Sequence, residues 1–151
     1  MLIKDLMTRP PAGVSQDATL EEAARHMAEA RVGALPVVED EHVVGMITDR
    51  DLVVRAMARG VSPNLRVEAL MSTDPVTVEA DTPVPAALYA MRSIDARHLP
   101  VVDHGRLVGV ISFDDLFCFL TGQLSVLAEV VNATRSTPDP LHRRRNRPAA
   151  P

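Results

Sequence analysis

The chain of 151 residues is poor in aromatic residues, with no Trp, one Tyr and three Phe. Proteins that bind single-stranded nucleic acid stack bases on aromatic side chains, so this composition argues against a nucleic-acid partner. The single cysteine, Cys118, excludes an intrachain disulfide. Because Cys118 lies between Phe117 and Phe119, we expect a buried thiol, with an intermolecular redox contact as the alternative.

Long apolar runs are also missing. The first ten residues lack the apolar segment of a signal peptide. The apolar runs at residues 116–120 and 127–131 are far shorter than the ~20 residues that span a bilayer. We therefore expect a cytoplasmic protein with no membrane span. Hydrophobic residues make up 46% of the chain and charged residues 24%, as in globular proteins that bury a core.

Charge is distributed unevenly along the chain. Residues 1–134 carry 11 basic and 19 acidic side chains, whereas residues 135–151 carry five Arg and one Asp. The Pro-rich and Arg-rich composition of residues 135–151 predicts a disordered basic tail. Its arginines at 143–145 offer a contact to RNA, anionic lipid or an acidic partner, but so short a run is more typical of a solubilising tail.

The two halves of the chain repeat each other. Residues 3–52 align with residues 67–116 at a constant offset of 64 without a gap, and 16 of the 50 aligned positions are identical. Such a repeat predicts two copies of one supersecondary unit. A unit of ~60 residues buries too little surface to be stable alone, so we expect the two copies to pack around a pseudo-two-fold axis.

Each repeat is predicted to fold as strand, helix, strand, strand and helix, which gives an α+β fold of two β-α-β-β-α units. Thr19 with Glu22 predicts a capping box, and Thr82 before Pro83 predicts the matching N-cap in the second repeat. Gly60 is expected to end the closing helix of the first repeat. The predicted boundaries are 1–60 for repeat 1, 61–66 for a linker, 67–120 for repeat 2, 121–134 for a C-terminal helix extension and 135–151 for the tail.

The last helix is expected to run long, because apolar residues recur at helical spacing as far as Val131. One pair of repeats is too small to cover so much apolar surface. We assign the extension to the interface of a homodimer, and the alternative is that it folds back onto its own core.

The most informative motif lies where the third strand of each repeat enters its second helix. It reads GMITDRD in the first repeat and GVISFDD in the second. Backbone N–H groups at a helix N-terminus favour an anion, so a hydroxyl there can reach phosphate, and a carboxylate three residues later can accept ribose hydroxyls. The pairs Thr48 with Asp51 and Ser112 with Asp115 also fit helix caps, and capping is the favoured interpretation of one such motif alone.

The order of these motifs resembles the CBS (cystathionine beta-synthase) domain pair, the regulatory module also called a Bateman module. The resemblance covers residues 1 to about 120. It rests on Met-Thr-x-x-Pro at 7–11 and Met-Ser-x-x-Pro at 71–75, on the Leu-Pro-Val-Val runs at 35–38 and 99–102, and on the Gly-x-Ile-[Thr/Ser]-x-x-Asp motifs. The chain is most similar to stand-alone bacterial members, which carry no catalytic domain.

The resemblance implies a regulatory module rather than an enzyme. An adenine nucleotide (AMP, ADP, ATP or a related adenosyl ligand) would bind in a cleft between the repeats and signal by conformational change. No other cofactor is implied, and the five histidines show no metal-ligand spacing. The implied site residues are Asp51 and Asp115 for ribose, Thr48, Ser112, Arg97 and His98 for phosphate, and the backbone at Gly33, Ala34, Leu35, Pro36, Ala96 and Pro100 for the base.

The two clefts are not expected to be equivalent. Just before its Leu-Pro-Val-Val run, the second repeat has the basic side chains Arg97 and His98, whereas the first repeat has Gly33 and Ala34 at the equivalent positions. Asp114 adds negative charge that disfavours phosphate beside its own helix. We therefore predict the main site in the cleft that Thr48 and Asp51 close. The alternative function is a ligand-free dimeric scaffold for an unknown protein partner, in which the hydroxyls only cap helices.

Overall fold

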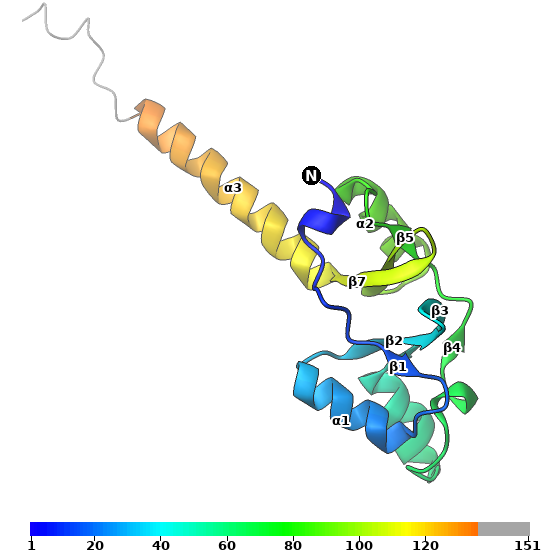
Figure 1. Cartoon of the computed structure of the whole chain (residues 1–151). Coiled ribbons are helices and arrows are strands. Elements are labelled where there is room, and N and C mark those ends of the chain that lie inside the picture. The colour runs from blue at the N-terminus through cyan, green and yellow to red at the C-terminus, as the bar shows by residue number, and fades with distance from the viewer. Residues whose placement is uncertain (136–151) are drawn as a thin grey trace, which may run out of the picture. The chain divides into compact units, whose positions relative to one another are not determined.

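The computed structural model describes residues 1–135, which divide into a compact unit Met1–Leu116 and a second unit from Phe117 onward (Figure 1). The first unit contains the two aligned segments of the repeats, residues 3–52 and 67–116. Apart from Arg135, the predicted basic tail and its arginines lie outside the described residues.

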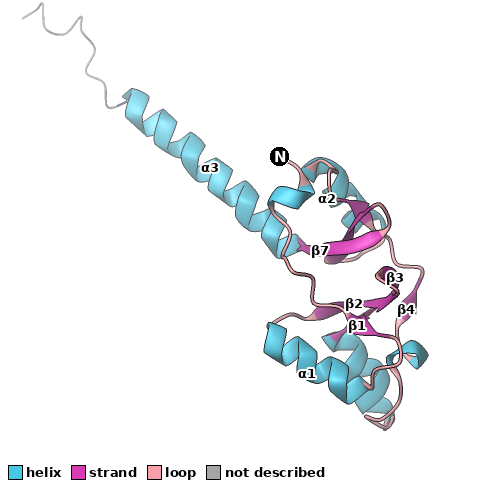
Figure 2. Cartoon of the chain, viewed as in Figure 1, coloured by secondary structure: helices cyan, strands magenta, loops and turns pink. Residues whose placement is uncertain are grey.

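The first unit contains two sheets, and the first three strands of one sheet match the three strands of the other (Figure 2). The fourth strand of the first sheet, Ser72–Thr73, comes from the second repeat. In both, the first strand pairs in parallel with the second and the second pairs antiparallel with the third. Leu35 pairs with Ile47 as Leu99 pairs with Ile111. The predicted α+β repeat is therefore confirmed. The strands are β1 (Val14–Ser15), β2 (Ala34–Glu39), β3 (His42–Thr48) and β4 (Ser72–Thr73) in the first sheet, and β5 (Val78–Glu79), β6 (His98–Asp103) and β7 (Arg106–Ser112) in the second.

The first helix of each repeat is α1 (Leu20–Ala30) or α2 (Val84–Ser93). The predicted capping box of α1 is confirmed, because Thr19 N–H donates to Glu22 at 2.8 Å and Glu22 N–H donates to the Thr19 hydroxyl at 3.1 Å. The predicted cap of α2 is wrong by one residue. Pro83 is the N-cap rather than the first helical residue, because its ψ of 145° is extended and not helical.

The closing helix of the first repeat differs from the regular helix that the pattern predicts. It contains a π-helical segment, Asp51–Ala56, and then a 3₁₀ turn, Met57–Arg59. Gly60 ends it in the left-handed conformation, as predicted. The corresponding helix of the second repeat, α3 (Phe113–Arg135), is a regular α-helix. π-Helical turns are rare and occur frequently at functional sites.

The first 3₁₀ turn of each repeat packs into the core of the other repeat. Ile3, in the turn Ile3–Asp5, donates its N–H to the carbonyl of Thr82 at 2.9 Å, and is buried with the second repeat. Val67, in the turn Val67–Ala69, donates to the carbonyl of Ala18 at 2.8 Å and is buried with the first. The packing halves therefore do not coincide with the sequence repeats, and the exchange explains why residues 1–116 form one unit.

The same exchange requires glycine at two matched positions. A Cβ on Gly45 would lie 2.5 Å from Sδ of Met71, and a Cβ on Gly109 would lie 2.5 Å from Sδ of Met7. Neither distance is compatible with a side chain in the present packing. The shared Gly and Met of the two repeats thus reflect one contact that the fold makes twice.

The second unit is described by helix α3 from Phe117 to Arg135, which runs without a break through Gly122. Cys118 is exposed, so the predicted burial of its thiol is wrong. By length and composition alone α3 could span a membrane, since its best 18-residue window has a mean hydropathy of 1.5. The apolar residues of α3 are separated by polar ones, so the short uninterrupted apolar runs in the sequence do not reveal how apolar the whole helix is. One such helix is weak support for a span.

Candidate functional site

Two clefts open within the first unit, and each is lined by residues of both repeats. The larger has a volume of about 870 Å³ and the smaller about 280 Å³. Small-molecule pockets usually measure ≈ 300–1,000 Å³, so the larger cleft has the volume of a ligand site.

The larger cleft brings together the side chains predicted for the main site. Thr48 and Asp51 line it from the first repeat, and Arg97 and His98 line it from the second. The smaller cleft is lined by Ser112, Asp115, Gly33 and Ala34, and it shares His98 with the larger one. Ala96 and Pro100 line the larger cleft, to which Gly33 and Ser112 also contribute, whereas Leu35 and Pro36 are fully buried and line neither.

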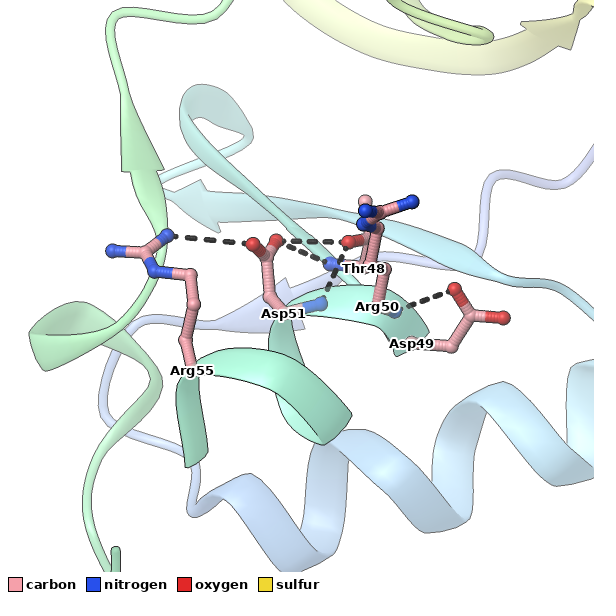
Figure 3. Close-up of polar contacts among 5 residues, drawn as sticks. All are labelled: Thr48, Asp49, Arg50, Asp51 and Arg55. Atoms are coloured by element: carbon pink, nitrogen blue, oxygen red, sulfur yellow. Dashed lines mark hydrogen bonds and ion pairs between the residues drawn. The ribbon is translucent and has the colours of Figure 1, made fainter. Parts of the chain in front are cut away.

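Thr48 and Asp51 form a complete helix cap (Figure 3). Oδ2 of Asp51 accepts from the Thr48 N–H at 3.0 Å and from the Thr48 hydroxyl at 2.9 Å, while the hydroxyl accepts from the Asp51 N–H at 3.1 Å. Ser112 and Asp115 repeat the arrangement at 2.9, 2.6 and 3.1 Å. The capping interpretation is therefore confirmed for both motifs.

The cap leaves no free amide at the start of this helix. Asp49 N–H donates to the carbonyl of Gly33 at 2.9 Å, and Arg50 N–H donates to Oδ1 of Asp49 at 2.7 Å. Together with the capped N–H groups of Thr48 and Asp51, all four N–H groups of residues 48–51 have partners within the protein. The sequence argument for an anion at the open helix end is thus wrong, because such a site needs unpaired N–H groups.

The Thr48 hydroxyl is committed as well. A carboxylate has no proton, so in the 2.9 Å contact with Asp51 the hydroxyl must be the donor, and it has only one proton to give. In this conformation Thr48 orients Asp51 and cannot also donate to a phosphate. The second oxygen of Asp51, Oδ1, has only a 3.4 Å contact with Arg55 and keeps acceptor capacity for ligand hydroxyls.

The cationic side chains of the larger cleft are Arg50 and Arg97. Arg97 forms a 2.9 Å ion pair with Asp114 and lies over the ring of Phe113, 5.5 Å from its centroid. Arg50 lines the same cleft, and its guanidinium has no hydrogen bond or ion pair within residues 1–135. The sequence prediction did not include Arg50. The signal was present, because the two motifs differ in charge at this position, with Arg50 in one and Asp114 in the other.

His98 is half-buried where the two clefts adjoin. Burial lowers the pKa of its imidazole below the ordinary value of 6.5, and the adjacent Arg97 charge lowers it further. Asp114, Asp49 and Asp115 oppose this shift. This shift favours the neutral imidazole, whereas the sequence prediction treated His98 as a basic ligand for phosphate.

Acidic side chains outnumber basic ones in the larger cleft. Asp49, Asp51, Asp95 and Asp114 face Arg50 and Arg97. Such a lining favours ligands that carry little negative charge. Within the described part of the chain, no group of three or more His, Cys, Asp and Glu side chains is placed to hold a metal ion.

The family model for the CBS domain matches the chain twice, over residues 3–57 and 67–122. The CBS domain-containing protein YhcV of Bacillus subtilis is 40% identical over 114 residues, which cover 76% of this chain and 81% of that protein. Hypoxic response protein 1 of Mycobacterium tuberculosis is 33% identical over 115 residues, which cover 75% of this chain and 80% of the relative. Neither name is that of an enzyme.

Solved structures superpose on both repeats together. The CBS domain protein PAE2072 from Pyrobaculum aerophilum, complexed with AMP, matches with a TM-score of 0.75 and 32% identity, covering 85% of this chain and 99% of that one. The CBS domain pair of MJ0100, in complex with 5-methylthioadenosine and S-adenosyl-L-methionine, matches with a TM-score of 0.75 and 27% identity, covering 82% and 98%. A structure of hypoxic response protein with two coordinated zinc ions matches with a TM-score of 0.71 and 32% identity, covering 77% and 96%.

Proposed function

The chain belongs to the CBS domain family, and on that premise we propose that it is a regulatory module that binds an adenine nucleotide or a related adenosyl ligand in the larger cleft. One observation carries the proposal. A single cleft of about 870 Å³ joins the capped carboxylate of Asp51 to the guanidinium groups of Arg50 and Arg97, which come from opposite repeats. The AMP and S-adenosyl-L-methionine ligands of the two structural neighbours support the same ligand class.

Each part of the ligand has a counterpart in the cleft. The cap holds Asp51 so that its Oδ1 can accept the ribose hydroxyls, and Thr48 acts by fixing that carboxylate. Arg50 and Arg97 are the groups that would pair with a phosphate. The base would rest against the apolar lining, which includes Met46, Pro75, Val76, Ile94, Ala96 and Pro100.

The charge of the cleft sets the expected order of affinity. Four aspartates against two arginines make each added phosphate costly, so AMP should bind more tightly than ADP, and ADP more tightly than ATP. A cationic adenosyl compound such as S-adenosylmethionine avoids this repulsion altogether.

A ligand in this cleft touches both repeats and can therefore bias how they pack. It shifts the packing only to the extent that it binds one arrangement better than the other. The signal would be a change in the surface that the module offers to a protein partner.

Isothermal titration calorimetry of the full chain against AMP, ADP, ATP and S-adenosylmethionine tests the proposal. Saturable binding of at least one of them is expected, with affinity falling as phosphates are added. No heat of binding at millimolar concentrations of all four ligands would overturn it.

A ligand-free scaffold is the second candidate function. It is supported by the complete caps at Thr48 and Ser112, which give both hydroxyls a structural role without a ligand. The same titration distinguishes the two functions, because a scaffold binds none of the four compounds.

A further inference from the structure

Helix α3 continues beyond the part of the chain that the family match explains. The match to the second CBS domain ends at residue 122, whereas the helix ends at Arg135. The proposed nucleotide site uses no residue of this extension, so its role is a separate question.

Five exposed apolar residues of α3 form one stripe along the helix, and the exposed Val126 and Val130 lie outside it. They recur at intervals of three and four residues, the heptad spacing by which two helices pack around each other. Their exposed fractions lie between 40% and 64%. The residues of this α3 stripe are Phe117, Leu120, Leu124, Leu127 and Val131.

We propose that the α3 stripe pairs with the α3 stripe of a second copy of this chain as a two-stranded coiled coil. Charge is compatible with self-pairing, because Glu129 is the one charged residue from 117 to 134. At helical spacing Glu129 falls on the side away from the stripe, together with Ser125 and Asn132. Two copies can therefore meet along the stripe without bringing like charges together.

The exposed area of the stripe is close to what a small specific interface buries. At the observed exposed fractions, the stripe offers on the order of 500 Å² of apolar surface in each copy, and two copies approach the ~1,000 Å² that a specific interface needs. Apolar faces of this size are uncommon on soluble monomers unless they mark an interaction site.

The polar residues of α3 argue against a lipid partner. A single membrane-spanning helix faces lipid all round, and here Gln123, Glu129 and Asn132 would lie in the hydrocarbon.

The test compares two glutamate substitutions in the full chain, Leu124→Glu on the stripe and Ser125→Glu on the polar side. Sedimentation velocity over 1–100 µM should show a dimer for the unchanged chain and for Ser125→Glu. Leu124→Glu should raise the dimer dissociation constant about a hundredfold or more, because it places a charge on each side of the buried seam. Far-ultraviolet circular dichroism establishes that both variants remain folded.

Four results would overturn the proposal. In sedimentation, these are a monomer for the unchanged chain at 100 µM, or a dimer that Leu124→Glu leaves intact. The third is binding of the unchanged chain to phosphatidylcholine vesicles that Leu124→Glu abolishes. The fourth is a monomer whose melting temperature falls with Leu124→Glu but not with Ser125→Glu. The last result would show that the stripe packs against its own chain.

Discussion

The pseudo-symmetry of the module supplies a matched pair of variants, Asp51→Ala and Asp115→Ala. Each carboxylate accepts two hydrogen bonds from the first residue of its own cap, so each substitution removes the same capping interaction. Losing a helix cap costs about 1 kcal/mol, which lowers the melting temperature of a chain of this size by ~2–4 °C. Asp51→Ala also removes the long 3.4 Å contact with Arg55, a part-buried pair worth about a few tenths of a kcal/mol.

Nucleotide affinity should separate the two variants. If Asp51 Oδ1 accepts both ribose hydroxyls, Asp51→Ala removes two hydrogen bonds to a charged group, each worth about 1.5–3 kcal/mol. The loss of ~3 kcal/mol or more corresponds to a dissociation constant about a hundredfold higher. Asp115 lines the smaller cleft, so Asp115→Ala should leave the affinity for AMP within about threefold.

Differential scanning fluorimetry gives the stability of both variants, and calorimetry with AMP gives their affinities. A similar loss of stability with a loss of affinity for Asp51→Ala alone is the expected outcome. The reasoning fails if Asp51→Ala binds AMP as well as the unchanged chain does, or if the two variants lose affinity equally.

Three further predictions follow from packing and charge. Gly45→Ala should destabilise the module by ~1–3 kcal/mol in urea unfolding, because its Cβ would lie 2.5 Å from Met71 Sδ and 2.9 Å from a backbone oxygen. The control Gly122→Ala, whose Cβ meets nothing within 4 Å, should stabilise α3 by ~0.5–1 kcal/mol. Equal effects of the two substitutions would contradict the packing account. Asp114→Asn should release Arg97 from its ion pair and tighten ATP binding by up to about fivefold, more than AMP binding, in calorimetry; an unchanged ATP affinity would show that this pair does not compete with phosphate. The pKa of His98 is lower in the folded state than in the unfolded state, so the unfolded chain takes up the proton first on acidification. The free energy of unfolding should therefore decrease as the pH falls from about 6.5 toward the folded-state pKa. Urea unfolding between pH 5 and 8 should show a flatter pH dependence for His98→Gln, and an unchanged slope would refute the assignment.

The sequence predicted the repeat because local pattern and offset agree. Strands at matched positions, the Thr19 capping box and the end at Gly60 are all decided by residues within a few positions of one another. The exchange of Ile3 and Val67 between the repeats was not predictable in this way. An apolar pattern shows that a side chain is buried, but it does not show in which core.

The candidate site was predictable as a list of residues more than as a set of contacts. The cleft does join Thr48 and Asp51 to Arg97 and His98. What the residue types could not show is how each polar group is already used. The Thr48 proton is donated to Asp51 and Arg97 is paired with Asp114, and both contacts depend on the folded geometry.

A crystal structure of the protein grown with saturating AMP tests the central claim most directly. The account predicts adenosine in the cleft of about 870 Å³, with ribose hydroxyls within hydrogen-bond distance of Asp51 Oδ1 and the phosphate facing Arg50 and Arg97. An empty cleft at saturating AMP, or a nucleotide bound at Ser112 and Asp115 instead, would contradict it.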